Sequence, residues 1–271
     1  MAPNRGKYRG CGRLSPPLPK KWVVAGIAAC VSLTAGCGPG GGRVPLEDVR
    51  ISDIGASGDS AAGSLRLIES VNIEASLIEI PVENRQALAV LWSRLDSRPV
   101  RLTDADAAAA NSLVVRFGRP RDAAGVLDVL EKASARNTKT SSMLFTDARY
   151  SEVSVKYLQR PATITYALPG GGADELAIGP GELKLRVEAT RISGSQSLCG
   201  LNAVFVYRPD AAVPPRREVV FSSTAFGIMM KPGRFVLIGP ARYEPYGGRL
   251  ADVLFERRGP RPTVAVLLLS L

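Results

Sequence analysis

The chain of 271 residues carries 35 Lys and Arg against 25 Asp and Glu, a formal net charge of +10, and it contains no histidine. The absence of histidine excludes Ser-His-Asp and Cys-His catalytic groups, histidine metal ligands and the usual histidine pH switch. Aromatic residues make up only 6%, which disfavours a platform for stacking nucleic-acid bases. With 45% hydrophobic and 22% charged residues, the composition is that of an ordinary globular protein.

The positive charge is concentrated in the first 36 residues. They hold six basic residues and no acidic one, and the remaining 29 basic and 25 acidic residues leave a charge of only +4. A basic surface for nucleic acid is therefore not indicated. Within this segment, residues 22–33 are uncharged and mostly apolar. Such a run suits the hydrophobic region of an export signal and is short for a membrane span of about 20 residues.

The end of this apolar run resembles the lipobox of bacterial lipoproteins, with the sequence Leu33-Thr34-Ala35-Gly36-Cys37. The resemblance implies that Cys37 receives a diacylglycerol, that residues 1–36 are removed and that the new amino group is acylated. A lipobox usually has Leu three residues before the Cys, where this chain has Thr34. The stretch ending at Cys30 fits the box more literally, but it leaves an apolar region of only about eight residues. An ordinary or uncleaved signal is the third alternative.

A lipidated Cys37 would make the protein a membrane-anchored envelope lipoprotein that faces the periplasm, with the outer membrane as the expected site. Two or three acyl chains give stable anchoring, and the Gly- and Pro-rich residues after Cys37 are typical of a flexible tether. Cleavage would remove Cys11 and Cys30, so Cys199 would be the one free thiol and no internal disulfide could form. With no histidine to act as its base, Cys199 is interpreted as a semi-buried thiol without a chemical role.

Residues 37–64 are interpreted as tether and lead-in, and order is expected to begin near residue 65. Residues 71–80 alternate apolar and polar side chains over the first seven positions, which predicts a strand with Val71, Ile73, Ala75 and Leu77 on one face. Helical spacing predicts helices over residues 83–95, 105–115 and 122–135. Thr103 and Asp106 resemble a capping box for the second helix. The third is expected to bury Val126, Leu127, Val129, Leu130 and Ala133.

After residue 137 the pattern changes to short β-rich runs separated by Pro and Gly turns. The runs cover residues 140–145, 152–158, 162–168, 182–192, 203–207, 219–230, 235–238 and 263–271. They predict an antiparallel sheet system, and with the helices inserted after the first strand the fold class is α+β, predominantly antiparallel β. Residues 65–271 are expected to form a single domain. The final apolar run, residues 264–269, must be a central strand covered on both faces or lie in lipid.

No motif in the chain supports catalysis, a metal site or a cofactor. The Gly170-Gly171-Gly172 run lacks the Lys-Ser/Thr of a phosphate loop and is interpreted as a turn. Glu74 and Glu79 cannot share a face of one strand because their spacing is odd. Asp104 and Asp106 are expected to stabilise the start of a helix. The Arg216-Arg217 and Arg257-Arg258 pairs are interpreted as loop charges. Because none of these motifs supports catalysis, the protein is not expected to be an enzyme.

The order of segments from residue 71 onward resembles the core domain of bacterial secretins, the outer-membrane channels of type II and III secretion and pilus systems. The similar segments are residues 71–80, 127–131, 141–146, 152–155, 181–192, 221–224, 231–239, 250–258 and 263–271. The chain departs from the family in lacking a series of periplasmic domains before the core and in carrying helices where secretins have long gate hairpins. The resemblance therefore implies a reduced, divergent relative.

Together these features predict an envelope lipoprotein with a reduced secretin-like domain, acting as a structural or interaction component linked to secretion or transport across the outer membrane. Its expected partners are membrane lipid at the anchor and either further copies of itself or secretion-system proteins, with no nucleic acid. The alternative is a monomeric envelope lipoprotein that binds a protein or polymer partner and has no pore activity.

Overall fold

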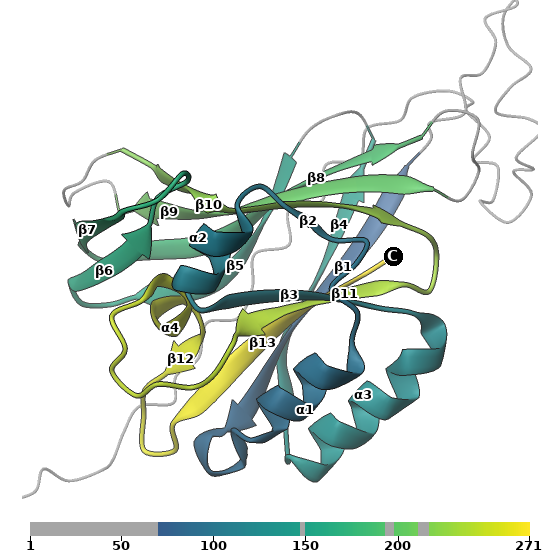
Figure 1. Cartoon of the computed structure of the whole chain (residues 1–271), viewed down its shortest axis with the longest axis horizontal. Coiled ribbons are helices and arrows are strands. Elements are labelled where there is room, and N and C mark those ends of the chain that lie inside the picture. The colour runs from purple at the N-terminus through teal and green to yellow at the C-terminus, as the bar shows by residue number, and fades with distance from the viewer. Residues whose placement is uncertain (1–69, 147–149, 193–197, 211–216) are drawn as a thin grey trace, which may run out of the picture. The chain divides into compact units, whose positions relative to one another are not determined.

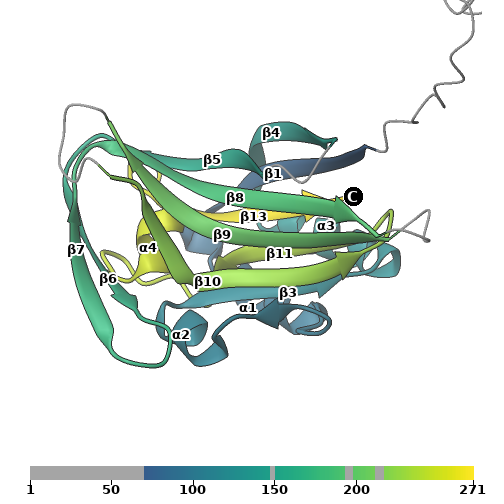
Figure 2. The ribbon, with the colours of Figure 1, turned by 90° about the horizontal axis from the view of Figure 1, so that it is seen from above.

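The computed structural model describes residues 70–146, 150–192, 198–210 and 217–271. These residues form an α+β fold in which two antiparallel sheets lie face to face and helices cover the outer face of one of them (Figures 1 and 2). The predicted fold class is confirmed. The predicted signal peptide with Cys30, the proposed lipidation site Cys37 and the tether lie outside the described residues.

The first sheet is built around the last strand of the chain. Its strand order is β3-β11-β13-β1-β4, with β12 also pairing with β13. The bounds are β1 Val71–Pro81, β3 Leu113–Gly118, β4 Arg136–Phe145, β11 Phe235–Pro240, β12 Glu256–Arg257 and β13 Thr263–Ser270. β13 lies between β11 and β1, and its apolar side chains are buried on both faces of the sheet, with Val266 on one side and Leu267 on the other. The prediction of a central final strand is confirmed.

The second sheet has the order β2-β10-β9-β8-β5 and packs one face against the first sheet. Its strands are β2 Arg101–Leu102, β5 Tyr150–Leu158, β8 Gly181–Arg191, β9 Cys199–Pro209 and β10 Val219–Met230. Alternation in β8 sends Leu183, Leu185 and Val187 into the core, where none has measurable exposure. Lys184 and Arg186 point the other way, so the outer face of this sheet is charged.

Helices cover the other face of the first sheet. Helix α1 (Ala87–Arg94) and helix α3 (Pro120–Lys132) bury Leu91, Trp92 and Leu130 against β1, β11 and β13. The Trp92 indole N–H donates to the carbonyl of Pro240 at 3.0 Å, which ties α1 to the end of β11. A short 3-10 helix (Val82–Asn84) precedes α1, and two short helices, α2 (Ala105–Ala110) and α4 (Leu250–Phe255), pack near one end of the sheets (Figure 1).

A separate hairpin of β6 (Ala162–Ala167) and β7 (Ala173–Ile178) lies beside α2 and α4. Its turn contains Gly170, Gly171 and Gly172, all with positive φ, so the turn interpretation of this run is confirmed. The sequence does not predict strand β7, because Asp174 and Glu175 interrupt the apolar pattern at its start.

Three predictions about the helices were wrong. The helix expected over residues 105–115 ends at Ala110, where Ser112 takes a positive φ, and the Val-rich residues after it form β3. The cap of this helix is Asp104 and not Thr103, since the Asp104 carboxylate accepts the Ala107 N–H at 2.8 Å. Leu127, expected in the core, is 63% exposed.

Candidate functional site: a basic cleft

A cleft of about 840 Å³ opens where the two sheets part, between β5 and the segment that contains α4 and β12. Lys139 of β4 and Leu77 of β1 line it from the first sheet, and residues 154–163 line it from β5 and the start of β6. Five basic side chains line the cleft, against the single carboxylate of Glu256. They are Lys139, Lys156, Arg160, Arg257 and Arg258. The lining of the cleft therefore carries an excess of positive charge, which Glu79 behind Arg257 partly offsets.

Two of these cations are held rigidly by main-chain carbonyls. The Lys156 Nζ donates to the carbonyl oxygens of Val253 and Glu256 at 2.7 and 2.8 Å. The Arg257 guanidinium donates to the carbonyls of Leu254 and Val155 and lies 3.7 Å from the Glu79 carboxylate. The last turn of α4 is thus fastened to β5 by two side chains, each of which is mostly buried. The interpretation of Arg257 as a loop charge was wrong, because it belongs to β12.

Burial lowers the pKa values of both Lys156 and Arg257. It lowers the pKa of Lys156 to about 8, helped by the nearby positive charge of Arg257. Burial also lowers the pKa of Arg257 to about 10, against the opposing effect of Glu79. Lys156 is therefore mostly charged at neutral pH, and an anion bound beside it would favour that charged form.

The outer wall of the cleft is a turn at residues 244–248. Tyr246, at positive φ and 78% exposed, stands under the Arg258 guanidinium at 4.8 Å from its ring centroid. The Glu256 carboxylate accepts the Tyr246 N–H at 3.4 Å and pairs with Arg258 at 2.8 Å. Glu256 thus has its charge compensated inside the wall, and the exposed part of Arg258 faces the cleft opening.

Asp252 lies beneath this turn with one carboxylate oxygen that has no hydrogen-bond partner among the described residues. The side chain is nearly fully buried, and a Cβ added at Gly247 would collide with it. Burial raises the pKa of Asp252 to about 6, and the negative charge of Glu244 acts in the same direction. Above that pH the fold must therefore hold an ionised carboxylate that is poorly compensated.

We expect Asp252→Asn to stabilise the protein at pH 7 by about 1–3 kcal/mol, and to have little effect at pH 4. The raised pKa means that the folded state binds the proton more tightly, so the cost of ionising Asp252 grows between about pH 4 and 6 and is complete above that range. Urea unfolding at both pH values measures the change in the free energy of unfolding, with exposed Asp106→Asn as the control. A loss of stability at pH 7 would show that the ionised carboxylate has a stabilising partner.

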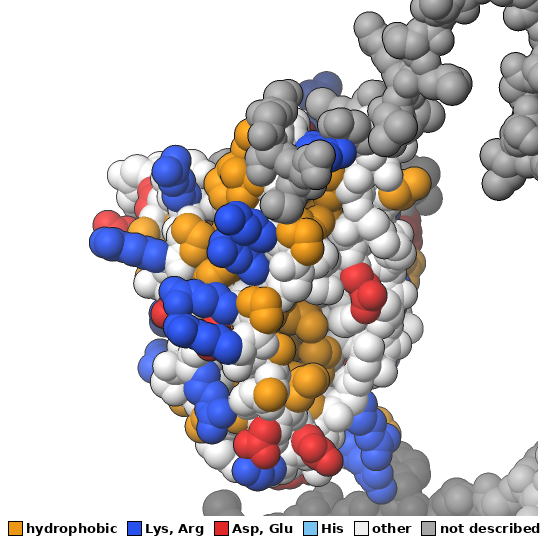
Figure 3. Space-filling view, turned by 90° about the vertical axis from the view of Figure 1, so that its right-hand side faces the viewer, with side chains coloured by type: hydrophobic (Ala, Val, Ile, Leu, Met, Phe, Trp, Pro, Cys, Tyr) orange, Lys and Arg blue, Asp and Glu red, His pale blue; other side chains and the backbone are white. Residues whose placement is uncertain are grey.

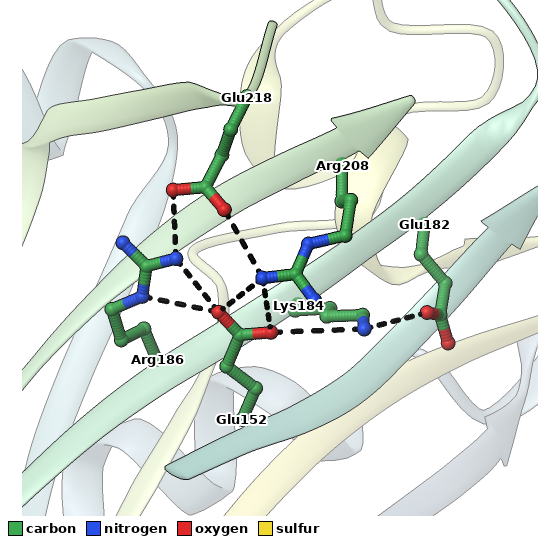
Figure 4. A network of polar contacts seen from close by, with 6 residues as sticks. All are labelled: Glu152, Glu182, Lys184, Arg186, Arg208 and Glu218. Atoms are coloured by element: carbon green, nitrogen blue, oxygen red, sulfur yellow. Dashed lines mark hydrogen bonds and ion pairs between the residues drawn. The ribbon is translucent and has the colours of Figure 1, made fainter. Parts of the chain in front are cut away.

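A second cluster of charges lies on the outer face of the other sheet (Figure 4). Glu152 of β5 sits at its centre, within 2.7 Å of Arg186, 3.0 Å of Arg208 and 3.7 Å of Lys184. Glu218 joins Arg186 to Arg208, and Glu182 pairs with Lys184. Hydrogen bonds from Arg186 and Arg208 lower the pKa of Glu218, although its partial burial opposes this. With three acids and three bases the network is neutral, and its role is to join strands β5, β8 and β9 to the residue preceding β10.

Of the other residues considered from sequence, Cys199, Glu74 and Asp104 lie apart from both clusters, whereas Glu79 pairs with Arg257 of the cleft. Cys199, the first residue of β9, is free and buried, and burial raises the pKa of its thiol. Glu74 is exposed, whereas Glu79 accepts a hydrogen bond from Thr263. Asp104 caps α2, and hydrogen bonds from the Ala107 and Gly170 N–H groups lower its pKa. The cleft itself was missed, because its residues come from four distant segments and share no motif.

Within the described ranges no group of three or more Cys, Asp or Glu is placed to hold a metal ion. None of the helices in this part of the chain is long and apolar enough to cross a membrane. Comparison with known protein families, with curated proteins and with solved structures finds no match.

Proposed function

We propose that this chain is a membrane-anchored envelope lipoprotein whose folded domain is a non-catalytic interaction component, and that it holds an anionic protein or polymer partner in the basic cleft. The observation that carries the proposal is the ratio of five basic side chains to one carboxylate in a cleft of about 840 Å³. A surface that merely needs to be soluble mixes both signs, as the neutral network around Glu152 does.

The arrangement of the cleft suits binding. Lys156 and Arg257 are fixed in place before any ligand arrives, because main-chain carbonyls hold them. Lys139 and Arg160 at the rim are exposed and can adapt to a partner. Charge complementarity of this kind speeds encounter and selects partners by sign. The one lining carboxylate, Glu256, is engaged by Arg258, so among the described lining residues no free carboxylate offers acid–base chemistry.

We expect the double variant Arg160→Gln with Arg258→Gln to bind fluorescent polyglutamate about five- to tenfold more weakly than the unchanged chain, since each of these exposed side chains contributes up to about 1 kcal/mol to an ion pair. The matched control is Arg85→Gln with Arg261→Gln, which removes the same charge from two exposed residues outside the cleft. Fluorescence anisotropy on the full chain in detergent measures both. Equal weakening by the two variants would show that binding depends on net charge and not on the cleft.

The anchor is tested separately by mass spectrometry of the native, membrane-extracted protein. The expected mass corresponds to a chain that begins at a lipidated Cys37. A chain that begins elsewhere, or an unmodified Cys37, would contradict this part of the proposal and would leave the cleft measurement unaffected.

The second candidate function is the secretin-like one, in which several copies assemble. Open strand edges favour it. Among the described strands β4 pairs only with β1, and β5 pairs only with β8, so each has one free edge. Leu144, Tyr150 and Tyr157 on these strands are more than half exposed, and free edges of this kind can pair with another chain. Light scattering of the detergent-extracted protein should give a multimer if this proposal holds, and a monomer would contradict it.

A further inference from the structure

The end of the domain opposite the cleft carries a second group of basic residues. This basic end consists of Arg119 and Arg121 at the start of α3 and of Lys231 and Arg234 in the turn between β10 and β11. The two segments are in contact, because a Cβ added at Gly233 would lie only 3.3 Å from the Pro120 ring. Figure 3 looks onto this end of the molecule, where Lys and Arg side chains gather along one side of a band of hydrophobic ones.

The basic end has a positive excess after its ion pairs are counted. Arg119 pairs with Asp96 at 2.9 Å, and Arg121 lies 3.7 Å from Asp122. Both pairs are largely exposed and therefore weak. Lys231 is exposed, and Arg234 is partly buried with its guanidinium over the Phe117 ring. Asp122 is further occupied by the Arg119 N–H, which it accepts as part of the helix cap.

The chain enters the domain at this same end. Ser70, the first described residue, lines a groove with Pro232 of the β10–β11 turn and Leu271 at the C-terminus. Arg191, the last residue of β8, lines the same groove. The first residue of β8, Gly181, instead pairs with Leu158 in the cleft. The two ends of β8 therefore lie at the cleft and at the basic end, which are at opposite ends of the sheet. The 11 residues of this strand span about 36 Å at most.

We infer that the basic end rests on an anionic lipid surface and that the cleft is thereby held facing away from the membrane. The inference depends on the proposed lipid anchor. Cys37 stands 33 residues before Ser70, so an anchored chain would keep the basic end at a high effective concentration beside the headgroups. Each Lys or Arg near an anionic leaflet contributes about 1 kcal/mol, and a basic patch is a common second signal beside acyl chains.

The test uses the full lipidated chain in vesicles of phosphatidylcholine alone or with phosphatidylglycerol added. A donor dye is attached at Ser70→Cys for the basic end or at Gln159→Cys for the cleft end, and an acceptor is placed on lipid headgroups. Anionic lipid should raise energy transfer from the Ser70 position and lower it from the Gln159 position. Salt should reverse both changes, because the attraction is screened.

Lys231→Glu with Arg234→Glu should abolish the response to anionic lipid. The control, Arg85→Glu with Arg261→Glu, makes the same charge change at two exposed residues beside the other end of β1 and should preserve the response. Equal loss in both variants, or approach of the Gln159 dye to the lipid, would overturn the inference. A chain shown by mass spectrometry to lack the lipid would overturn the anchor and the docking together, whereas a lipidated chain with no response would overturn the docking alone.

Discussion

Leu130→Ala should lower the free energy of unfolding by about 2–4 kcal/mol, whereas Leu127→Ala, three residues earlier on the same helix, should change it by less than about 0.5 kcal/mol. Leu130 is 6% exposed and packs in the core between α3 and the first sheet. Leu127 is 63% exposed and leaves no cavity when it is shortened. The two substitutions remove the same atoms from the same helix, so their difference isolates the effect of burial.

Urea unfolding with a common slope for both variants measures this difference. If Leu127→Ala cost as much as Leu130→Ala, the outward side of α3 would be covered in solution, and assembly through that helix would be the first explanation to examine. A small effect of both substitutions would contradict the packing of α3 against the sheet.

The outcome for α3 illustrates what the sequence could predict. Apolar residues at positions 126, 127, 129, 130 and 133 cover more than one side of a helix, and only the sheet beneath α3 decides which side is buried. Strands β1 and β8 could be predicted from their alternation, because only one of the two faces of such a strand is apolar enough to be buried. The prediction of one helix over residues 105–115 was wrong because no Pro or Gly separates the Ala-rich run from the Val-rich strand and marks the end of the helix.

The cleft could not be predicted because it depends on strand pairing between distant residues. Lys156 and Val253 are 97 positions apart, and they meet only because β5 lies at the edge of its sheet and α4 packs across it. For the same reason, the sequence alone does not indicate that Arg257 reaches the Val155 carbonyl of β5. By contrast, alternation alone places Lys184, Arg186 and Glu188 on one face of β8, since alternate residues of a strand share a face.

That charged face leads to the second large expected effect. Glu152→Gln should destabilise the protein by about 2–3 kcal/mol. Its side chain is only 11% exposed, and it compensates Lys184 and Arg186, which are 16% and 18% exposed. Removing the central negative charge leaves three neighbouring cations with two carboxylates. The loss is smaller than for a fully buried pair because Arg208 remains 45% exposed to solvent.

A double-mutant cycle with Arg186→Gln separates the network from its isolated parts. Arg186→Gln alone should also destabilise, because Glu152 loses the two hydrogen bonds that it accepts from Arg186 and one oxygen of Glu218 loses its donor. The double variant should cost less than the sum, since each substitution removes the partner that the other one leaves uncompensated. Asp128→Asn, which breaks an exposed pair with Lys132, is the control and should cost at most about 0.5 kcal/mol. Strict additivity of Glu152→Gln and Arg186→Gln would mean that the six side chains stabilise the sheet independently and that their contacts do not act as a network.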